Sequence, residues 1–194
     1  IERPTINAKC PPALAPATTI SSVEKFLSDA TSKNLSTDDI VVAGASAGGH
    51  LALMVGLSTN YKNKECLEEI PPKAIINIFG ITDIKETSKF LDNTKFFNAS
   101  NYVKGWIGPD SSLDEISNIL SPINLLDGID LNVLTIHGTK DRWVPYNQAV
   151  LLDQGLGEQH QLLTIDDGGH YNFSDEADEI IRQTISSFLK SNFN

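Results

Sequence analysis

The chain has 194 residues, of which 40% are apolar and 21% charged, and its formal net charge at pH 7 is −10. This length and composition favour one globular domain with a sizeable core. The Lys and Arg residues are scattered and no apolar run approaches roughly 18 residues, which excludes nucleic acid as a partner and a membrane span as an element. Cys10 and Cys66 are too few for a disulfide framework and are interpreted as isolated thiols. We expect a soluble protein, with the cytoplasm favoured over secretion.

The first part of the chain begins with an irregular segment and then alternates helices and strands. Residues 1–19 hold four prolines, which lack an amide donor and so disfavour a strand. Apolar residues at helical spacing predict a helix over 20–33. The β-branched run at 40–43 predicts a strand, and the nearly all-apolar segment 47–57 predicts a buried helix. A second apolar strand is expected over 74–79.

The second part of the chain continues this alternation after an insertion. Residues 81–127 have mixed polarity and are interpreted as a small cap-like excursion of short helices. Apolar runs predict strands over 132–137 and 161–165, and helical spacing predicts helices over 146–156 and 174–190. The last of these helices begins with acidic residues, which are favourable at a helix N-terminus.

The order of these elements predicts the fold class. Strands that are apolar on both faces and alternate with helices form a parallel sheet with helices on both sides. We therefore expect a three-layer α/β/α sandwich with a mainly parallel sheet. It forms one domain over residues 1–194, with the cap-like insertion at 81–127 inside it. The sequence shows no cluster of metal ligands, and we expect neither a metal nor a cofactor.

Residues 40–51 read IVVAGASAGGHL, which places Ser46 between Gly44 and Gly48 where a predicted strand meets a predicted helix. A Gly-x-Ser-x-Gly pattern in this position is typical of a nucleophile elbow. The sharp turn forces the serine to a positive φ, and small residues two positions before and after it avoid a clash. Ser46 is therefore the candidate nucleophile. The backbone N–H of Ala47, at the start of the helix, is the candidate oxyanion donor.

A serine nucleophile needs a base, which should follow the acid in the order Ser, Asp, His. Of the four histidines, His170 follows the fourth predicted strand, where active sites of open α/β sheets lie. It is the candidate base. His137 is interpreted as a structural residue that shapes a turn, His50 as a packed helix residue and His160 as an exposed residue.

The candidate acid is Asp141, which lies in a turn between the third predicted strand and the helix after it. Asp83, after the second strand, and Asp166 or Asp167, close to His170, are its rivals. We favour Asp141 because loops that follow predicted strands then carry Ser, Asp and His in the required order.

Five segments carry a likeness to a known family: GASAGGHLA (44–52), FGITD (79–83), SPINLL (121–126), HGTKDRWVPY (137–146) and GGHYNF (168–173). Together they resemble the α/β-hydrolases, and within them the carboxylesterases similar to hormone-sensitive lipase and to bacterial acetyl or feruloyl esterases. The resemblance implies Ser46 as nucleophile, Asp141 as acid and His170 as base. It also implies hydrolysis of a small-molecule carboxylic ester through an acyl-enzyme.

The resemblance also implies a region that we do not find here. In the family, several strands and a Gly-rich HGGG-type loop, which supplies a second oxyanion donor, precede the elbow. The 39 residues before Ile40 contain no glycine. We therefore expect the chain to be the C-terminal part of such an enzyme, N-terminally incomplete. We expect its elbow strand to pair with a second copy of the chain or with a completing N-terminal segment.

Two other functions stay open at this point. An amidase or peptidase uses the same three residues, and a non-catalytic binding module derived from a hydrolase retains the same fold. The aromatic residues between 90 and 106 are interpreted as core or as lining of a substrate pocket.

Overall fold

The computed structural model describes residues 29, 32–34, 39–58, 72–92 and 112–193. Several expectations concern residues outside these ranges: the irregular segment 1–19, most of the helix predicted over 20–33, Cys10, Cys66 and the aromatics Phe96, Phe97, Tyr102 and Trp106. None of the helices in the described residues is long and apolar enough to cross a membrane.

The centre of the molecule is a four-stranded sheet in the order β1-β2-β3-β4. All neighbouring strands pair in parallel, as the apolar segments predicted. Strand ends differ from the predicted ones by no more than two residues. The strands are β1 (Val41–Ala45), β2 (Ala74–Ile78), β3 (Asn132–Gly138) and β4 (His160–Ile165).

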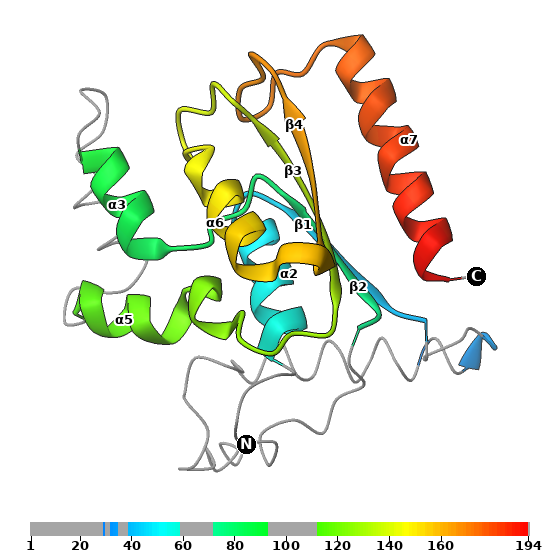
Figure 1. The fold of residues 1–194 in the computed structure, drawn as a ribbon, viewed down its shortest axis with the longest axis horizontal. Coiled ribbons are helices and arrows are strands. Elements are labelled where there is room, and N and C mark those ends of the chain that lie inside the picture. The colour runs from blue at the N-terminus through cyan, green and yellow to red at the C-terminus, as the bar shows by residue number, and fades with distance from the viewer. Residues whose placement is uncertain (1–28, 30–31, 35–38, 59–71, 93–111, 194) are drawn as a thin grey trace.

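Helices cover both faces of the sheet, which confirms the three-layer α/β/α fold (Figure 1). On one face, α2 (Ala47–Ser58) and α6 (Asn147–Leu156) pack on Ile75 and Val133. On the other face, α7 (Asp175–Asn192) packs through Ala177 and Phe188 on an all-apolar surface of the strands. Helix α7 begins where predicted, because the Ser174 side chain accepts a hydrogen bond from the Ala177 amide and caps it.

Helix α2 is buried along most of its length, as its composition predicted. Leu53 and Leu57 are fully buried against the sheet. Ala47 and Leu51 are exposed, with 61% exposure for Leu51. The prediction of a buried helix is therefore wrong at these two positions.

The face of the sheet under α2 and α6 changes from apolar to polar towards the carboxyl ends of the strands. In β2, Ile75 is followed on the same face by Asn77, and in β3, Val133 is followed by Thr135 and His137. All five side chains are buried, with 0% exposure. The Asn77 amide donates to the Thr135 hydroxyl at 3.3 Å. The sheet thus presents a polar layer at the edge where its parallel strands end.

The segment 81–127 contains α3 (Ile84–Asp92), α5 (Leu113–Leu120) and the 3-10 helix η2 (Pro122–Leu125) in its described part. These helices lie to one side of the sheet, opposite α7 (Figure 1). The Ile84 amide donates to the Ser121 hydroxyl at 3.1 Å, which links the start of α3 to the end of α5. The description of 81–127 as a cap within one domain stays a prediction.

Two buried histidines help to hold the layers together. The Nδ1 atom of His50, in α2, lies 3.0 Å from the carbonyl oxygen of Ile81 in the loop after β2. His160, the first residue of β4, lies between Asp153 of α6 (Nδ1···Oδ1 3.0 Å) and Thr135 of β3 (Nε2···Oγ1 2.8 Å). The side chain of His160 is fully buried, so the prediction that it is exposed is wrong. It belongs to the strand, and its ring faces α6 instead of solvent.

The elbow strand β1 lies at one end of the sheet and pairs only with β2 in the described part of the chain. Ala43 and Ala45 are exposed, and Val41 and Val42 are partly buried. Unpaired strand edges with apolar side chains are prone to pair with another strand.

We expect the 194-residue chain to associate through the edge of β1 that has no strand partner among the described residues. A lysine on an edge strand disfavours such pairing, so Ala43→Lys should lower the mass measured by light scattering. Ser187→Lys, which adds the same charge on exposed α7, is the control and should leave the mass unchanged. A monomeric wild-type chain, or equal masses for the two variants, would contradict this prediction.

We also expect the free energy of unfolding to fall as the pH drops below about 6.5, the ordinary histidine pKa. Burial lowers the pKa of His50, against the opposing hydrogen bond with Ile81, and burial likewise lowers that of His160. The unfolded chain therefore binds more protons than the folded chain in this range, and stability is full above about 6.5 and is lost below it.

Urea unfolding measured between about pH 7.5 and 5.5 checks this expectation. The double variant His50→Gln/His160→Gln should have a shallower dependence on pH, because glutamine does not titrate. Equal pH dependence in the wild type and the double variant would show that these two side chains are not the cause.

Candidate active site

Ser46 occupies the single residue between β1 and α2. Its φ is 55°, which confirms the predicted positive φ. Its amide donates to the carbonyl oxygen of Ile78 at 2.9 Å, so the turn is fixed to the end of β2. A non-glycine residue in this conformation costs on the order of 1–3 kcal/mol, which the surrounding contacts must offset. The strain orients the side chain out of the turn.

The glycines that the turn requires are not all those predicted. A Cβ at Gly44 would lie 2.1 Å from the Gly48 carbonyl oxygen, which confirms the need for glycine there. A Cβ at Gly48 would meet no described atom within 4 Å, so the described residues give no support to that part of the prediction. Two other glycines are essential instead. A Cβ at Gly49 would lie 2.9 Å from the Cα of Gly80, and one at Gly80 would lie 2.6 Å from the Gly49 carbonyl carbon.

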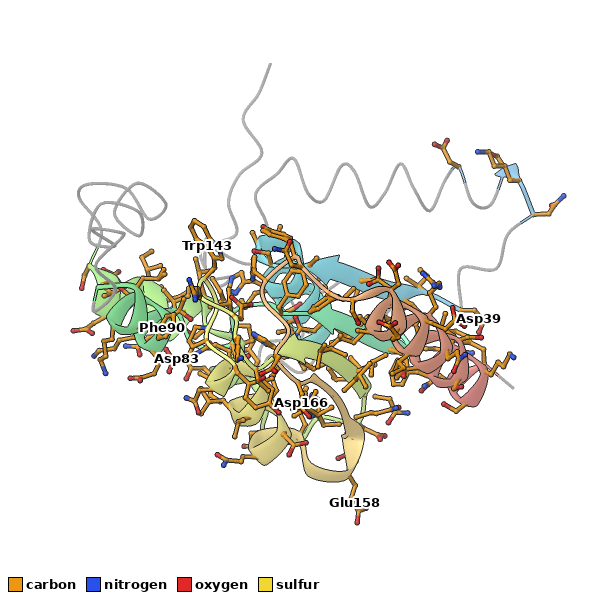
Figure 2. The ribbon with its side chains drawn as sticks, turned by 90° about the horizontal axis from the view of Figure 1, so that it is seen from above. Asp39, Asp83, Phe90, Trp143, Glu158 and Asp166 are labelled. Atoms are coloured by element: carbon orange, nitrogen blue, oxygen red, sulfur yellow. The ribbon has the colours of Figure 1, made fainter. Side chains whose placement is uncertain are left out.

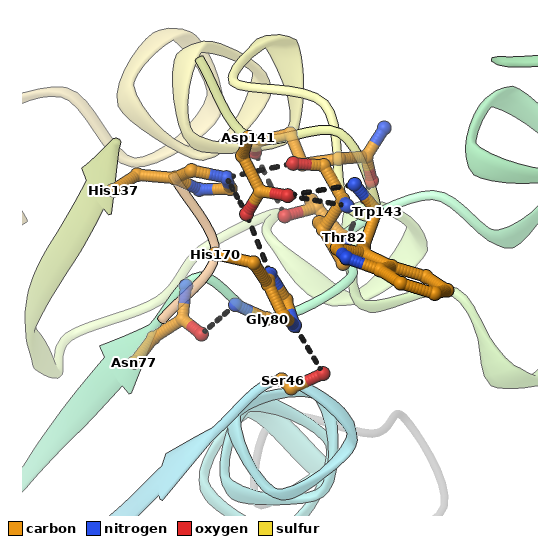
Figure 3. Close-up of polar contacts among 10 residues, drawn as sticks. Ser46, Asn77, Gly80, Thr82, His137, Asp141, Trp143 and His170 are labelled. Atoms are coloured by element: carbon orange, nitrogen blue, oxygen red, sulfur yellow. Dashed lines mark hydrogen bonds and ion pairs between the residues drawn. The ribbon is translucent and has the colours of Figure 1, made fainter. Parts of the chain in front are cut away.

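The structure brings Ser46, His170 and Asp141 together in one chain of hydrogen bonds (Figure 3). The Oγ atom of Ser46 lies 2.9 Å from Nε2 of His170. The Nδ1 atom of His170 lies 2.6 Å from Oδ2 of Asp141. With a proton on Nδ1 donated to the carboxylate, Nε2 is free to accept the serine hydroxyl proton. The three side chains come from the carboxyl ends of β1, β3 and β4.

The carboxylate of Asp141 is buried and held at both oxygens. Its Oδ1 accepts hydrogen bonds from the amides of Trp143 (2.8 Å) and Val144 (3.0 Å). Its Oδ2 lies 3.4 Å from Nε2 of His137, in addition to the contact with His170. Burial raises the pKa of this carboxyl, but the hydrogen bonds from the two histidines and the two amides outweigh it and hold the pKa well below its usual range. Asp141 is therefore ionised at neutral pH.

The rival acids make other contacts. Asp83 accepts a hydrogen bond from the Glu86 amide (3.1 Å), and so caps α3. Asp167 is 79% exposed and pairs with Lys140 at 2.8 Å. Asp166 is also exposed, and Asp83 and Asp166 lie apart from each other (Figure 2). Among the described residues, the carboxylate hydrogen-bonded to the His170 ring is that of Asp141.

The other predicted roles for histidines can now be compared with their positions. His50 is a buried helix residue, as expected. His137 is fully buried, and its Nε2 donates to the Val144 carbonyl oxygen at 2.9 Å across the turn that carries Asp141. That contact confirms the prediction that His137 shapes a turn.

Sequence reasoning missed a buried glutamine beside the site. Gln148, in α6, has 0% exposure, and its Oε1 accepts from the amides of Thr82 (2.9 Å) and Asp83 (2.6 Å). The Thr82 hydroxyl donates in return to the Gln148 carbonyl oxygen at 2.8 Å. These bonds fix the loop after β2 to α6. In the sequence, a polar residue next to the apolar alanine and leucine positions of α6 could have indicated this buried role.

In the described residues, no group of three or more His, Cys, Asp or Glu side chains is placed to hold a metal ion. Trp143 projects outward from the loop after β3 (Figure 2), and its side chain is 45% exposed. Tyr171, next to His170 in sequence, is 70% exposed. Ser46 is half-buried and His170 and Asp141 are buried, and exposed aromatic rings lie close to them in sequence.

The fold is shared with several solved hydrolases. A puromycin-hydrolyzing peptidase of Mycobacterium tuberculosis is 22% identical, with a TM-score of 0.62 over 80% of this chain and 22% of its own. An acylaminoacyl peptidase of Pyrococcus horikoshii is 20% identical, with a TM-score of 0.69 over 88% of this chain and 26% of its own. A bifunctional GH43-CE protein of Bacteroides eggerthii is 21% identical, with a TM-score of 0.65 over 87% and 26%. The chain thus spans about a quarter of the length of these proteins.

Sequence comparison gives the family directly. No curated protein matches this sequence. The model of the BD-FAE family matches residues 10–156, which include the turn of Ser46, the loop after β2 and the turn of Asp141. The chain therefore belongs to the BD-FAE family, and its fold is of the α/β-hydrolase type.

Proposed function

We propose that this chain carries the catalytic residues of a serine hydrolase that cleaves carboxylic esters. The observation that supports this most directly is the chain of short hydrogen bonds from Ser46 Oγ through His170 to Asp141. Membership of the BD-FAE family and the fold shared with solved hydrolases support the same reaction class.

In the proposed reaction, the Oγ atom of Ser46 attacks the ester carbonyl carbon while Nε2 of His170 takes the hydroxyl proton. Asp141 stabilises the imidazolium that forms and keeps the ring in the required tautomer. His170 then gives its proton to the leaving alkoxide as the C–O bond breaks, which leaves an acyl group on Ser46. A water molecule, deprotonated by His170, attacks that acyl group. The bond between the acyl carbon and Oγ then breaks, His170 returns the proton to Oγ, and the carboxylic acid leaves.

The negative oxygen of the tetrahedral intermediate needs donors. Ala47 is the first residue of α2, and the first four amides of a helix have no acceptor within it. We assign the Ala47 N–H as one donor. In the family, the second donor comes from an HGGG-type loop. We propose that here it comes from a segment that joins the site at the edge of β1.

An amidase or peptidase is the second candidate. It is favoured by the two comparison structures named as peptidases, which share this fold. The same residues serve both reactions, but an amide needs stronger assistance to its leaving group than an ester does. Matched p-nitrophenyl ester and p-nitroanilide substrates separate the two: turnover of the ester without turnover of the anilide favours an esterase, and turnover of the anilide favours an amidase or peptidase. Binding of either substrate without turnover would favour a non-catalytic binding module.

We expect a serine-directed phosphonate to label Ser46 and no other serine, because Ser46 alone combines the strained elbow with a hydrogen bond to a histidine in the described residues. Mass spectrometry of the labelled chain measures this. Ser46→Ala should abolish labelling, and label on another serine or persistent label in the variant would reject the assignment.

Asp141→Asn should lower the labelling rate and the turnover of an ester by up to about 10⁴-fold, because the amide favours the wrong tautomer of His170. Asp83→Asn is the matched control, since that residue caps α3 and should cost about 1 kcal/mol of stability or less with little effect on rate. If Asp83→Asn were the damaging change and Asp141→Asn mild, the acid would be wrongly assigned.

A further inference from the structure

Phe79 has an unusual backbone conformation for its residue type. It directly follows β2 and has a φ of 42°. The other described non-glycine residues with positive φ are Asn34, Asp167 and Ser46. Asn and Asp tolerate this region, and Ser46 is the elbow residue, whereas for a bulky aromatic residue a positive φ is a true outlier. The strain at Phe79 therefore needs a compensating contact.

The compensating contacts of Phe79 are to the loop that carries the base. Its side chain is buried, and its ring centroid lies 4.5 Å from that of His170. The same ring meets Tyr171 edge-on at 5.8 Å and Phe173 at 6.0 Å. Tyr171 in turn lies 4.4 Å from the His170 ring, nearly perpendicular to it. The imidazole is thus supported by aromatic rings as well as by its hydrogen bonds.

The backbone beside Phe79 also contacts the nucleophile. The carbonyl oxygen of Ile78 accepts the amide of Ser46 at 2.9 Å. The amide of Phe79 donates to the Ile136 carbonyl oxygen of β3 at 2.8 Å. We call residues 77–80 the β2 corner. This corner therefore contacts the backbone of the nucleophile on one side and the ring of the base on the other.

Buried polar contacts fix the β2 corner. The Gly80 amide donates to Oδ1 of Asn77 at 2.9 Å, which closes the turn around Phe79 (Figure 3). Asn77 is fully buried and donates through its amide to Thr135 of β3. Gly80 packs against Gly49 with no space for a side chain on either residue. The corner is consequently held against β3 and against the first turn of α2.

We propose that Phe79 is a positioning residue of the active site: held in a left-handed conformation by the β2 corner, its ring sets the orientation of the His170 imidazole relative to Ser46. This inference rests on the proposed role of His170 as the base. A purely structural role would be met by any apolar side chain, and a simple turn would favour glycine or asparagine at a positive φ.

The test compares three variants of the full chain. Phe79→Asn suits the backbone but removes the ring, Phe79→Tyr keeps the ring, and Phe173→Leu removes an aromatic neighbour of Phe79 that has no described ring contact with His170. Rates of ester turnover and of phosphonate labelling at Ser46 are measured on each, with thermal unfolding followed by circular dichroism to establish that each is folded.

We expect Phe79→Asn to lower kcat and the labelling rate about 10- to 100-fold, the loss typical of a misplaced catalytic group, while KM changes less than about twofold. Phe79→Tyr and Phe173→Leu should stay within about threefold of wild type in kcat. If Phe79→Asn has no cooperative unfolding transition, Phe79→Leu replaces it with the same expected losses. Wild-type rates in a folded variant without the ring, or an equal loss in Phe173→Leu, would overturn the proposal.

A second measurement does not depend on catalysis. The proton shared by His170 Nδ1 and Asp141 should give a downfield NMR resonance that is sharp in wild type and in Phe79→Tyr but broadened or absent in Phe79→Asn. Absence of label on wild-type Ser46 would reject the proposed function, whereas an unchanged resonance in Phe79→Asn would reject the role of Phe79.

Discussion

The parallel, in-register pairing of β1 to β4 is the constraint on which the site depends. In a parallel sheet all strands end at the same edge, so residues far apart in sequence meet there. Ser46 and His170 are separated by 124 positions, yet their side chains lie 2.9 Å apart. Ser46 directly follows β1, and His170 lies in the loop after β4, at the same edge of the sheet. A slip of one residue in β4 would turn its apolar face from the core to the opposite side and move His170 away from Asp141.

The same edge of the sheet concentrates conformational strain. Ser46 and Phe79 follow two adjacent strands, and both have a positive φ, at a cost on the order of 1–3 kcal/mol each. The hydrogen bond from the Ser46 amide to the Ile78 carbonyl links the two turns, so that neither can relax alone. Rigid, strained turns supported by an apolar sheet hold side chains more precisely than mobile loops do. The buried, ionised carboxylate of Asp141 completes this arrangement from the third loop.

Much of this arrangement could be predicted from the sequence because it depends on local patterns. The apolar runs predicted the strands, and the Gly-x-Ser-x-Gly pattern predicted the positive φ of Ser46, since both follow from residue type and near neighbours. What could not be predicted depends on contacts between distant segments. His160 was predicted to be exposed, and only the pairing of β4 with β3 places its ring under α6. Gly49 and Gly80 needed to be glycine because their backbones meet across 31 positions of sequence.

The buried polar side chains beneath the site form a series of hydrogen bonds in which each group donates to the next. The Gly80 amide donates to Asn77, whose amide donates to Thr135. When His160 is neutral, the Thr135 hydroxyl can donate to its Nε2 while its Nδ1 donates to Asp153 at the surface. Each group in this series is satisfied by the next, as buried polar groups must be, and hydrogen bonds in such a series strengthen one another. Burial lowers the pKa of His160, which favours the neutral ring at neutral pH and with it this direction of the series. The conformation of the turn that carries Phe79 therefore depends on side chains in β3, β4 and α6 that make no hydrogen bond with Ser46, His170 or Asp141 among the described residues.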